Sequence, residues 1–106
     1  MNADQITLNE VLNNGSSIHL YREELTGCWV SFGYSAYLLS HESDLRHIAT
    51  FSDMMQMPCV CITSAALKHI IHDTLPPIES RDSYYRLPSP SSVDAAAYQS
   101  WVLSLK

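Results

Sequence analysis

The chain of 106 residues has the length of one ordinary domain and is too short for two. With 46% hydrophobic and 16% charged residues it can bury a core, which argues against an intrinsically disordered chain. Eleven acidic and six basic residues give a net charge of -5. That balance argues against a broad basic footprint for nucleic acid and against an anionic membrane surface.

The N-terminal sequence indicates the cellular compartment. The first twelve residues lack the positively charged start and apolar stretch of a signal peptide, and no apolar run is long enough to cross a bilayer. Three cysteines, an odd number without an export signal, are expected to be reduced thiols. The sequence therefore predicts a cytoplasmic protein that has no membrane segment.

A short helix is expected near the N-terminus. Thr7 and Glu10 have the spacing of a capping box, in which each side chain accepts a hydrogen bond from the backbone amide of the other residue. Asn14-Gly15 supplies the left-handed conformation that ends a helix. The helix is expected over 8–13.

The next segment has the pattern of an antiparallel β-hairpin. Apolar and polar residues alternate over 18–23, residues 24–27 can turn the chain, and strand-forming residues return over 28–32. After Gly33 a helical spacing of apolar residues replaces the alternation. A second helix is therefore expected over 35–40.

The middle of the chain leaves one segment open. Residues 44–57 fit either a weak strand over 46–51 or a loop. The apolar run 59–62, short and partly β-branched, predicts a buried strand. A helix should then begin at Thr63 or Ser64 and run through residue 72. Its apolar face is formed by Ala66, Leu67, Ile70 and Ile71.

Residues 76–92 are rich in proline and serine and are expected to form a surface connection, in which 84–87 have the character of a short edge strand. Ser91 and Asp94 have capping-box-like spacing, so the last helix is expected to begin there and to run to about residue 105. The residues expected to be buried beneath it are Val93, Ala97 and Trp101.

These elements predict a single domain over 1–106 of the α/β class, with α+β character. An N-terminal helix, a β-hairpin, further strands and three more helices should form a small mixed sheet with the helices packed on it.

Histidines and cysteines raise the question of a metal site. Cys59 and Cys61 share one face of the predicted strand, and His69 and His72 lie one helical turn apart. Zinc requires four converging ligands, and a C-x-C sequence in an extended strand does not make the tight turn that presents two sulfurs. We therefore expect the cysteines to be small core residues and the histidines to be solvated, with no metal and no cofactor.

No catalytic residue is predicted. Gly33, Tyr34 and Ser35 begin like a nucleophile elbow, but the second glycine is missing, and a helix cap is the expected role of Ser35. No basic cluster surrounds Cys28 to lower the pKa of its thiol.

Aromatic residues gather in and just after the hairpin. Two interpretations stay open: ordinary core packing, or a surface that docks a partner. The candidate interaction patch consists of Tyr21, Trp29, Phe32 and Tyr34.

The hairpin region resembles a known family. Residues 18–23, the turn containing Gly27 and the strand 28–32 resemble the N-terminal, mismatch-binding domain of the DNA mismatch-repair protein MutS. The later strand 57–62 and the helix 65–72 resemble that family's next proline-led strand and helix, so the resemblance covers roughly residues 17–72. It implies an α/β domain with a mixed sheet.

The resemblance does not extend to mismatch recognition. The family recognises a mismatch with a Phe-x-Glu wedge, and in an alignment that matches Phe32 and Ala36, Cys28 and Val30 occupy the wedge positions. Cysteine supplies no stacking plane, and valine accepts no hydrogen bond from a base. The family's ATPase cannot fit in this chain, so no functional residue is carried over.

Three classes of function remain. The first is a non-catalytic interaction module that docks a protein partner or a second copy of itself, and this is the prediction. The second is a nucleic-acid-associated domain, which would need Arg22, Arg46 and Arg86 to form one basic surface. The third is a small enzyme or metal-binding protein that uses the cysteines and histidines.

Overall fold

The computed structural model describes residues 3–13, 15, 17–41, 47–73, 76–89 and 93–106. Four helices and six strands are present in this part of the chain. The helices are α1 (Ala3–Leu12), α2 (Gly33–Ser40), α3 (Ser64–Asp73) and α4 (Ala95–Leu105). The strands are β1 (Ser17–Arg22), β2 (Trp29–Phe32), β3 (Ile48–Ser52), β4 (Met57–Ile62), β5 (Glu79–Arg81) and β6 (Tyr84–Pro88). The predicted fold class, helices packed on a small sheet, is confirmed.

The strands form one sheet in the order β3-β4-β2-β1-β6-β5, and each of the five pairings between described strands is antiparallel. A sheet of mixed direction was expected. The helical connections explain the difference: α2 joins β2 to β3 with β4 between them, and α3 joins β4 to a strand at the far edge. Each crossover therefore joins two strands that are not neighbours in the sheet. The strands that lie between them pair antiparallel with the strands on either side.

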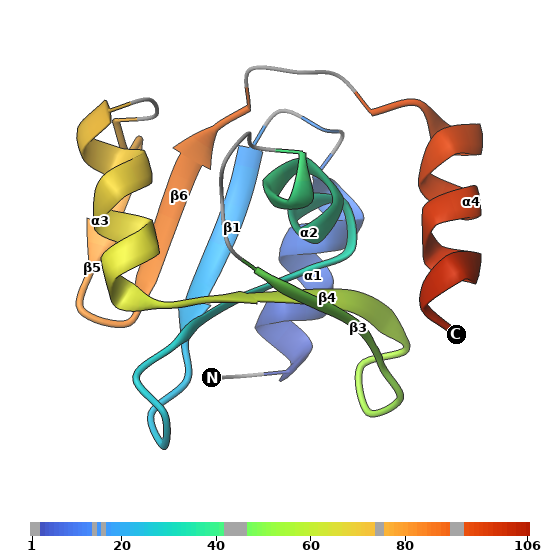
Figure 1. Cartoon of the computed structure of the whole chain (residues 1–106), viewed down its shortest axis with the longest axis horizontal. Coiled ribbons are helices and arrows are strands. Elements are labelled where there is room, and N and C mark those ends of the chain that lie inside the picture. The colour runs from blue at the N-terminus through green and yellow to red at the C-terminus, as the bar shows by residue number, and fades with distance from the viewer. Residues whose placement is uncertain (1–2, 14, 16, 42–46, 74–75, 90–92) are drawn as a thin grey trace.

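Helices cover the two faces of the sheet unequally. One face carries the larger core, where residues of β1, β2, β4 and β6 pack against α2 and α3. The other face carries a smaller cluster around Tyr21, Val30 and Phe32, against which Ile6 of α1 packs. In Figure 1 α2 crosses in front of the sheet and α1 lies behind it, while α4 stands to one side. Much of the α1 face is consequently open.

Most predicted elements are confirmed. The hairpin forms β1 and β2, and the predicted helices after Gly33 and after Thr63 are α2 and α3. Leu67 and Ile70 of α3 are buried, as expected from the apolar face of the predicted helix. The segment 44–57, which fitted either a strand or a loop, contains the strand β3. Residues 44–46 lie outside the described residues.

Two elements differ from the prediction. Helix α1 begins at Ala3, so Thr7 and Glu10 lie within it and form no cap at its start; burial of Ile6 extends the helix. The predicted surface connection contains the β5–β6 hairpin, and β6 pairs with both β1 and β5. Leu87 is fully buried, which explains why this segment joins the sheet interior.

The predicted last helix is confirmed, but its buried residues differ from those expected. Asp94 caps it, since its carboxylate accepts hydrogen bonds from the backbone N–H groups of Ala96 and Ala97. Val102 is buried, whereas Ala97 is exposed and Trp101 is only half-buried. Val93 packs partly buried against the larger core.

A buried polar network joins α1, β1 and α2. The Glu10 carboxylate accepts hydrogen bonds from the Ser35 hydroxyl (2.7 Å) and from the Ser35 backbone N–H (3.2 Å). The Ser35 hydroxyl oxygen in turn accepts from the His19 backbone N–H at 2.9 Å. Asn13 donates its side-chain N–H to the Ser17 carbonyl at 2.9 Å. Since Phe32, at the start of α2, offers no side-chain cap, Glu10 satisfies an amide there from a different helix.

Burial changes the protonation of Glu10. Removal from water raises the pKa of this carboxyl from its ordinary value of 4.5 to about 7, although its hydrogen bonds from Ser35 and Asn13 oppose the rise. The folded protein therefore binds this proton more tightly than the unfolded chain does. The resulting stability is fully present below pH 4.5 and is lost as the pH rises toward 7.

We expect Glu10 to make unfolding pH-dependent. Between about pH 5 and about pH 7.5 the free energy of unfolding should fall by on the order of 3 kcal/mol relative to Glu10→Gln, which cannot ionise. Urea denaturation of both proteins at the two pH values measures this. Glu24→Gln, at an exposed position in the β1–β2 turn, should keep the wild-type dependence. Identical pH profiles for wild type and Glu10→Gln would contradict the assignment.

Candidate functional site

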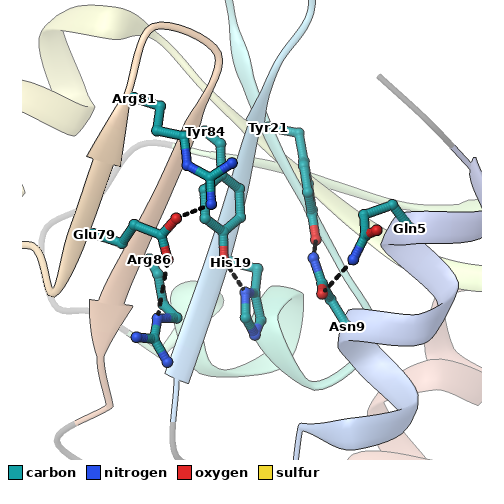
Figure 2. A network of polar contacts seen from close by, with 8 residues as sticks. All are labelled: Gln5, Asn9, His19, Tyr21, Glu79, Arg81, Tyr84 and Arg86. Atoms are coloured by element: carbon teal, nitrogen blue, oxygen red, sulfur yellow. Dashed lines mark hydrogen bonds and ion pairs between the residues drawn. The ribbon is translucent and has the colours of Figure 1, made fainter.

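An open groove lies on the α1 face of the sheet. It has a volume of about 660 Å³, within the range of roughly 300–1,000 Å³ that is usual for ligand sites. One wall is α1 and the other is the β5–β6 hairpin (Figure 2), and Arg22 and Glu24, at the start of the β1–β2 turn, also line the groove. Its lining residues are Gln5, Asn9, Tyr21, Arg22, Glu24, Glu79, Arg81, Ser83, Tyr84 and Arg86.

Strand register places the floor and the hairpin wall. His19 is opposite Arg86 and Tyr21 is opposite Tyr84, so alternate residues of β1 and β6 share this face. The β5 pairing continues the row, with Glu79 opposite Arg86 and Arg81 opposite Tyr84. Because α1 packs over Tyr21 and does not reach β5, these polar side chains remain open to solvent on one side.

The α1 wall is a chain of hydrogen bonds. Gln5 donates its side-chain N–H to the Asn9 carbonyl oxygen at 3.1 Å, and Asn9 donates to the Tyr21 hydroxyl oxygen at 2.8 Å (Figure 2). Burial raises the pKa of Tyr21 beyond its usual range, so its hydroxyl stays protonated. The wall therefore presents neutral donors and acceptors.

His19 and Tyr84 form the base of the opposite wall. Their Nδ1 and hydroxyl oxygen lie 2.6 Å apart, and the two rings stack with centroids 5.9 Å apart. Burial and the charge of Arg86 lower the pKa of His19, while burial raises the pKa of Tyr84. Both groups are thus held neutral, and positive charge in the groove comes from its arginines.

The arginines outnumber the carboxylates. Glu79 forms an ion pair with Arg81 and lies 3.9 Å from Arg86 Nε. That Nε is buried and donates no hydrogen bond to any residue in the described part of the chain. The Arg81 guanidinium also lies 5.3 Å from the centre of the Tyr84 ring. Arg22 and Glu24 also line the groove, so three arginines stand against two carboxylates there.

The structure brings two of the three predicted nucleic-acid contacts together. Arg22 and Arg86 both line the groove, whereas Arg46 lies outside the described residues. Arg81 was not singled out from the sequence. Its signal was the alternation of Glu79 and Arg81, which shows a shared strand face once this segment is recognised as a strand.

The four aromatic residues of the candidate interaction patch do not lie on one surface. Tyr21, Trp29 and Phe32 are each only 6% exposed. Trp29 belongs to the larger core on one face, whereas Tyr21 and Phe32 belong to the cluster on the other face. Tyr34 is half-buried, with its ring centre 4.6 Å from that of Tyr98 on α4. Central strands covered on both faces bury their aromatic side chains, so core packing is the correct interpretation.

Ser35 belongs to the buried polar network. Its hydroxyl is fully buried and bonded to Glu10, and Phe32 takes the cap position of α2, so the predicted capping role is wrong. Among the described residues no group of three or more His, Cys, Asp or Glu side chains is arranged to hold a metal ion. Cys59 lies on the α1 face, while α3, which carries His69, packs on the opposite face.

Comparison with protein-family models, with curated proteins and with solved structures finds no match. The resemblance of the hairpin region to the mismatch-binding domain therefore stays a prediction. Among the described residues no helix is both long and apolar enough to span a membrane.

We expect Tyr84→Phe to destabilise the protein by about 1 kcal/mol, because it removes the hydrogen bond to His19 and leaves that ring nitrogen without its partner. The free energy of unfolding in urea measures the loss. Tyr85→Phe is the matched control, since this neighbouring ring packs against Trp29 at 5.0 Å on the opposite face. Equal losses in the two variants would show that the contact with His19 contributes nothing.

Proposed function

We propose that the protein is a small non-catalytic interaction module whose groove binds an acidic segment of a protein partner. The observation that carries the proposal is the gathering of Arg22, Arg81 and Arg86 around one open cavity. These are three of the six basic residues of a chain whose net charge is -5. The groove is thus a locally basic site on an acidic molecule.

The chemistry of the groove suits a carboxylate. Guanidinium groups bind carboxylates through paired, charge-assisted hydrogen bonds. Glu79 already occupies this position between Arg81 and Arg86, which indicates what kind of group the two arginines hold. A carboxylate from a partner can reach the exposed part of the Arg86 side chain, which is 38% exposed. Tyr84 adds a half-buried ring for the apolar part of such a side chain.

A nucleic-acid ligand is the second candidate, because Arg22 and Arg86 line the same groove. It rests on the proposed resemblance to the mismatch-binding domain. Two features disfavour it. The net negative charge of the chain opposes a polyanion. Val30, at one wedge position of the resemblance, is buried.

A fluorescein-labelled glutamate-rich peptide should bind the protein at low salt, as measured by fluorescence anisotropy. Arg81→Gln and Arg86→Gln should each weaken binding about tenfold, since each removes a charge-assisted contact worth roughly 1.4 kcal/mol. Lys68→Gln, at an exposed position of α3 on the other side of the sheet, should leave the affinity unchanged. Circular dichroism establishes that the variants are folded.

The same assay distinguishes the two candidates. Labelled duplex and single-stranded DNA should give no signal at low salt. Micromolar DNA binding with a steep salt dependence would replace the proposed function with the second candidate. A peptide affinity that responds equally to Arg86→Gln and Lys68→Gln would show that the groove is not the binding site.

Self-association is the other form of interaction predicted from the sequence. We propose it separately, because α1 exposes apolar side chains. Leu8, Val11 and Leu12 are 51%, 75% and 73% exposed and recur at helical spacing on one stripe. A second copy could bury this stripe without occupying the groove.

The weight-average mass from light scattering is expected to rise above that of a monomer at high protein concentration. Leu12→Asp should abolish the rise, while Leu103→Asp, at a similarly exposed leucine of α4, should not. A monomer mass at every concentration would contradict the proposed self-association.

A further inference from the structure

Glu79 stands between two arginines of the groove. The antiparallel register places it opposite Arg86 on β6, and Arg81 lies two residues further along β5, on the same face of the strand. The Glu79 Oε2 forms an ion pair with the Arg81 guanidinium, and its Oε1 lies 3.9 Å from Arg86 Nε (Figure 2). The protein thus supplies its own carboxylate to two guanidinium groups of the site.

The two contacts of Glu79 differ in kind. Arg81 donates a hydrogen bond to the Glu79 carboxylate, so this pair combines charge with hydrogen bonding. The separation from Arg86 Nε, 3.9 Å, is too long for a hydrogen bond and leaves electrostatic attraction alone. Glu79 therefore satisfies one arginine and only approaches the other.

The internal carboxylate is free to exchange. Glu79 and Arg81 belong to β5, a three-residue strand at the edge of the sheet, and water reaches both side chains. Ion pairs that are open to water contribute little to stability, because water competes for both charges. Arg81 also lies over the Tyr84 ring, a contact that does not involve Glu79. The position between the arginines can thus change hands without disturbing the strand.

We propose that Glu79 is an internal competitor for the groove: it holds Arg81 and Arg86 in the absence of a partner, and an acidic segment must displace it to bind. This inference rests on the proposed function, because it concerns the regulation of the same site. Glu79 lowers the affinity for a carboxylate ligand and keeps the like charges of the two arginines neutralised while the groove is empty.

Glu24 provides a matched comparison. It lines the same groove and carries the same charge. Within the part of the chain that the structure describes, however, it forms no ion pair with an arginine. Removing the charge of Glu24 therefore changes the field in the groove without releasing a guanidinium group.

The test titrates the labelled glutamate-rich peptide at low salt and follows fluorescence anisotropy. Glu79→Gln keeps the size of the side chain and removes its charge, so it should strengthen binding about threefold, as expected for the release of exposed ion pairs. Glu79→Ala should give a similar gain, and Glu24→Gln a clearly smaller one. In a protein that already carries Arg81→Gln, Glu79→Gln should gain less, because its main contact is already gone. Circular dichroism establishes that the variants are folded.

The outcomes separate this inference from the proposed function. If wild type binds the peptide and the two Glu79 variants bind it no more tightly, the inference is overturned and the proposed function stands. Equal gains in Glu24→Gln and Glu79→Gln would also overturn it, since they would show a general effect of charge. Binding by neither wild type nor Glu79→Gln would overturn the proposed function together with the inference.

Discussion

The hydrogen bonds between Glu10 and Ser35 determine where α1 lies, and the α1 face of the sheet depends on that placement. Ile6 alone gives the helix a buried apolar contact with the sheet, and the other groups that anchor it are polar. Glu10 satisfies the start of α2, and Ser35 in turn accepts from β1, so two helices and a strand meet at one carboxylate. A buried carboxylate is costly unless several donors surround it, which explains why the network is complete and why the pKa of Glu10 is still raised.

The antiparallel order of the sheet then separates a closed face from an open one. α2 and α3 follow β2 and β4 and both fold onto the same face, where the larger core forms. Trp101 of α4 also packs against that core, so among the described helices α1 alone covers the other face, and one helix cannot cover six strands. Uncovered strands remain beside α1, among them the β5–β6 hairpin with its two arginines. The groove therefore follows from the topology of the sheet.

Local patterns predicted the elements whose structure is set locally. Alternation identified the β1–β2 hairpin, and one apolar face identified α3. The failures involve partners that are distant in the sequence. Glu10 has capping-box spacing to Thr7, yet it bonds to Ser35, 25 residues away. The β5–β6 hairpin is short and rich in charge, so only its pairing with β1 shows that it belongs to the sheet. Arg22 and Arg86 were named together from the sequence, but the groove that they line could not be predicted, since it depends on that register.

The two walls of the groove are held by interactions of very different strength, and this difference shapes what the groove can do. Asn9 and Gln5 belong to the same rigid helix as Glu10, so their wall is anchored by buried hydrogen bonds. The opposite wall includes the three-residue edge strand β5, on which the Arg81 side chain is 68% exposed and the Glu79 side chain 33% exposed. An incoming carboxylate competes with Glu79 for the arginines on this second wall. Ion pairs in solvent are worth less than about 1 kcal/mol, so displacing Glu79 costs little and leaves the anchored wall intact. Under the proposed function, such a groove would exchange its internal carboxylate for an external one without loosening the fold.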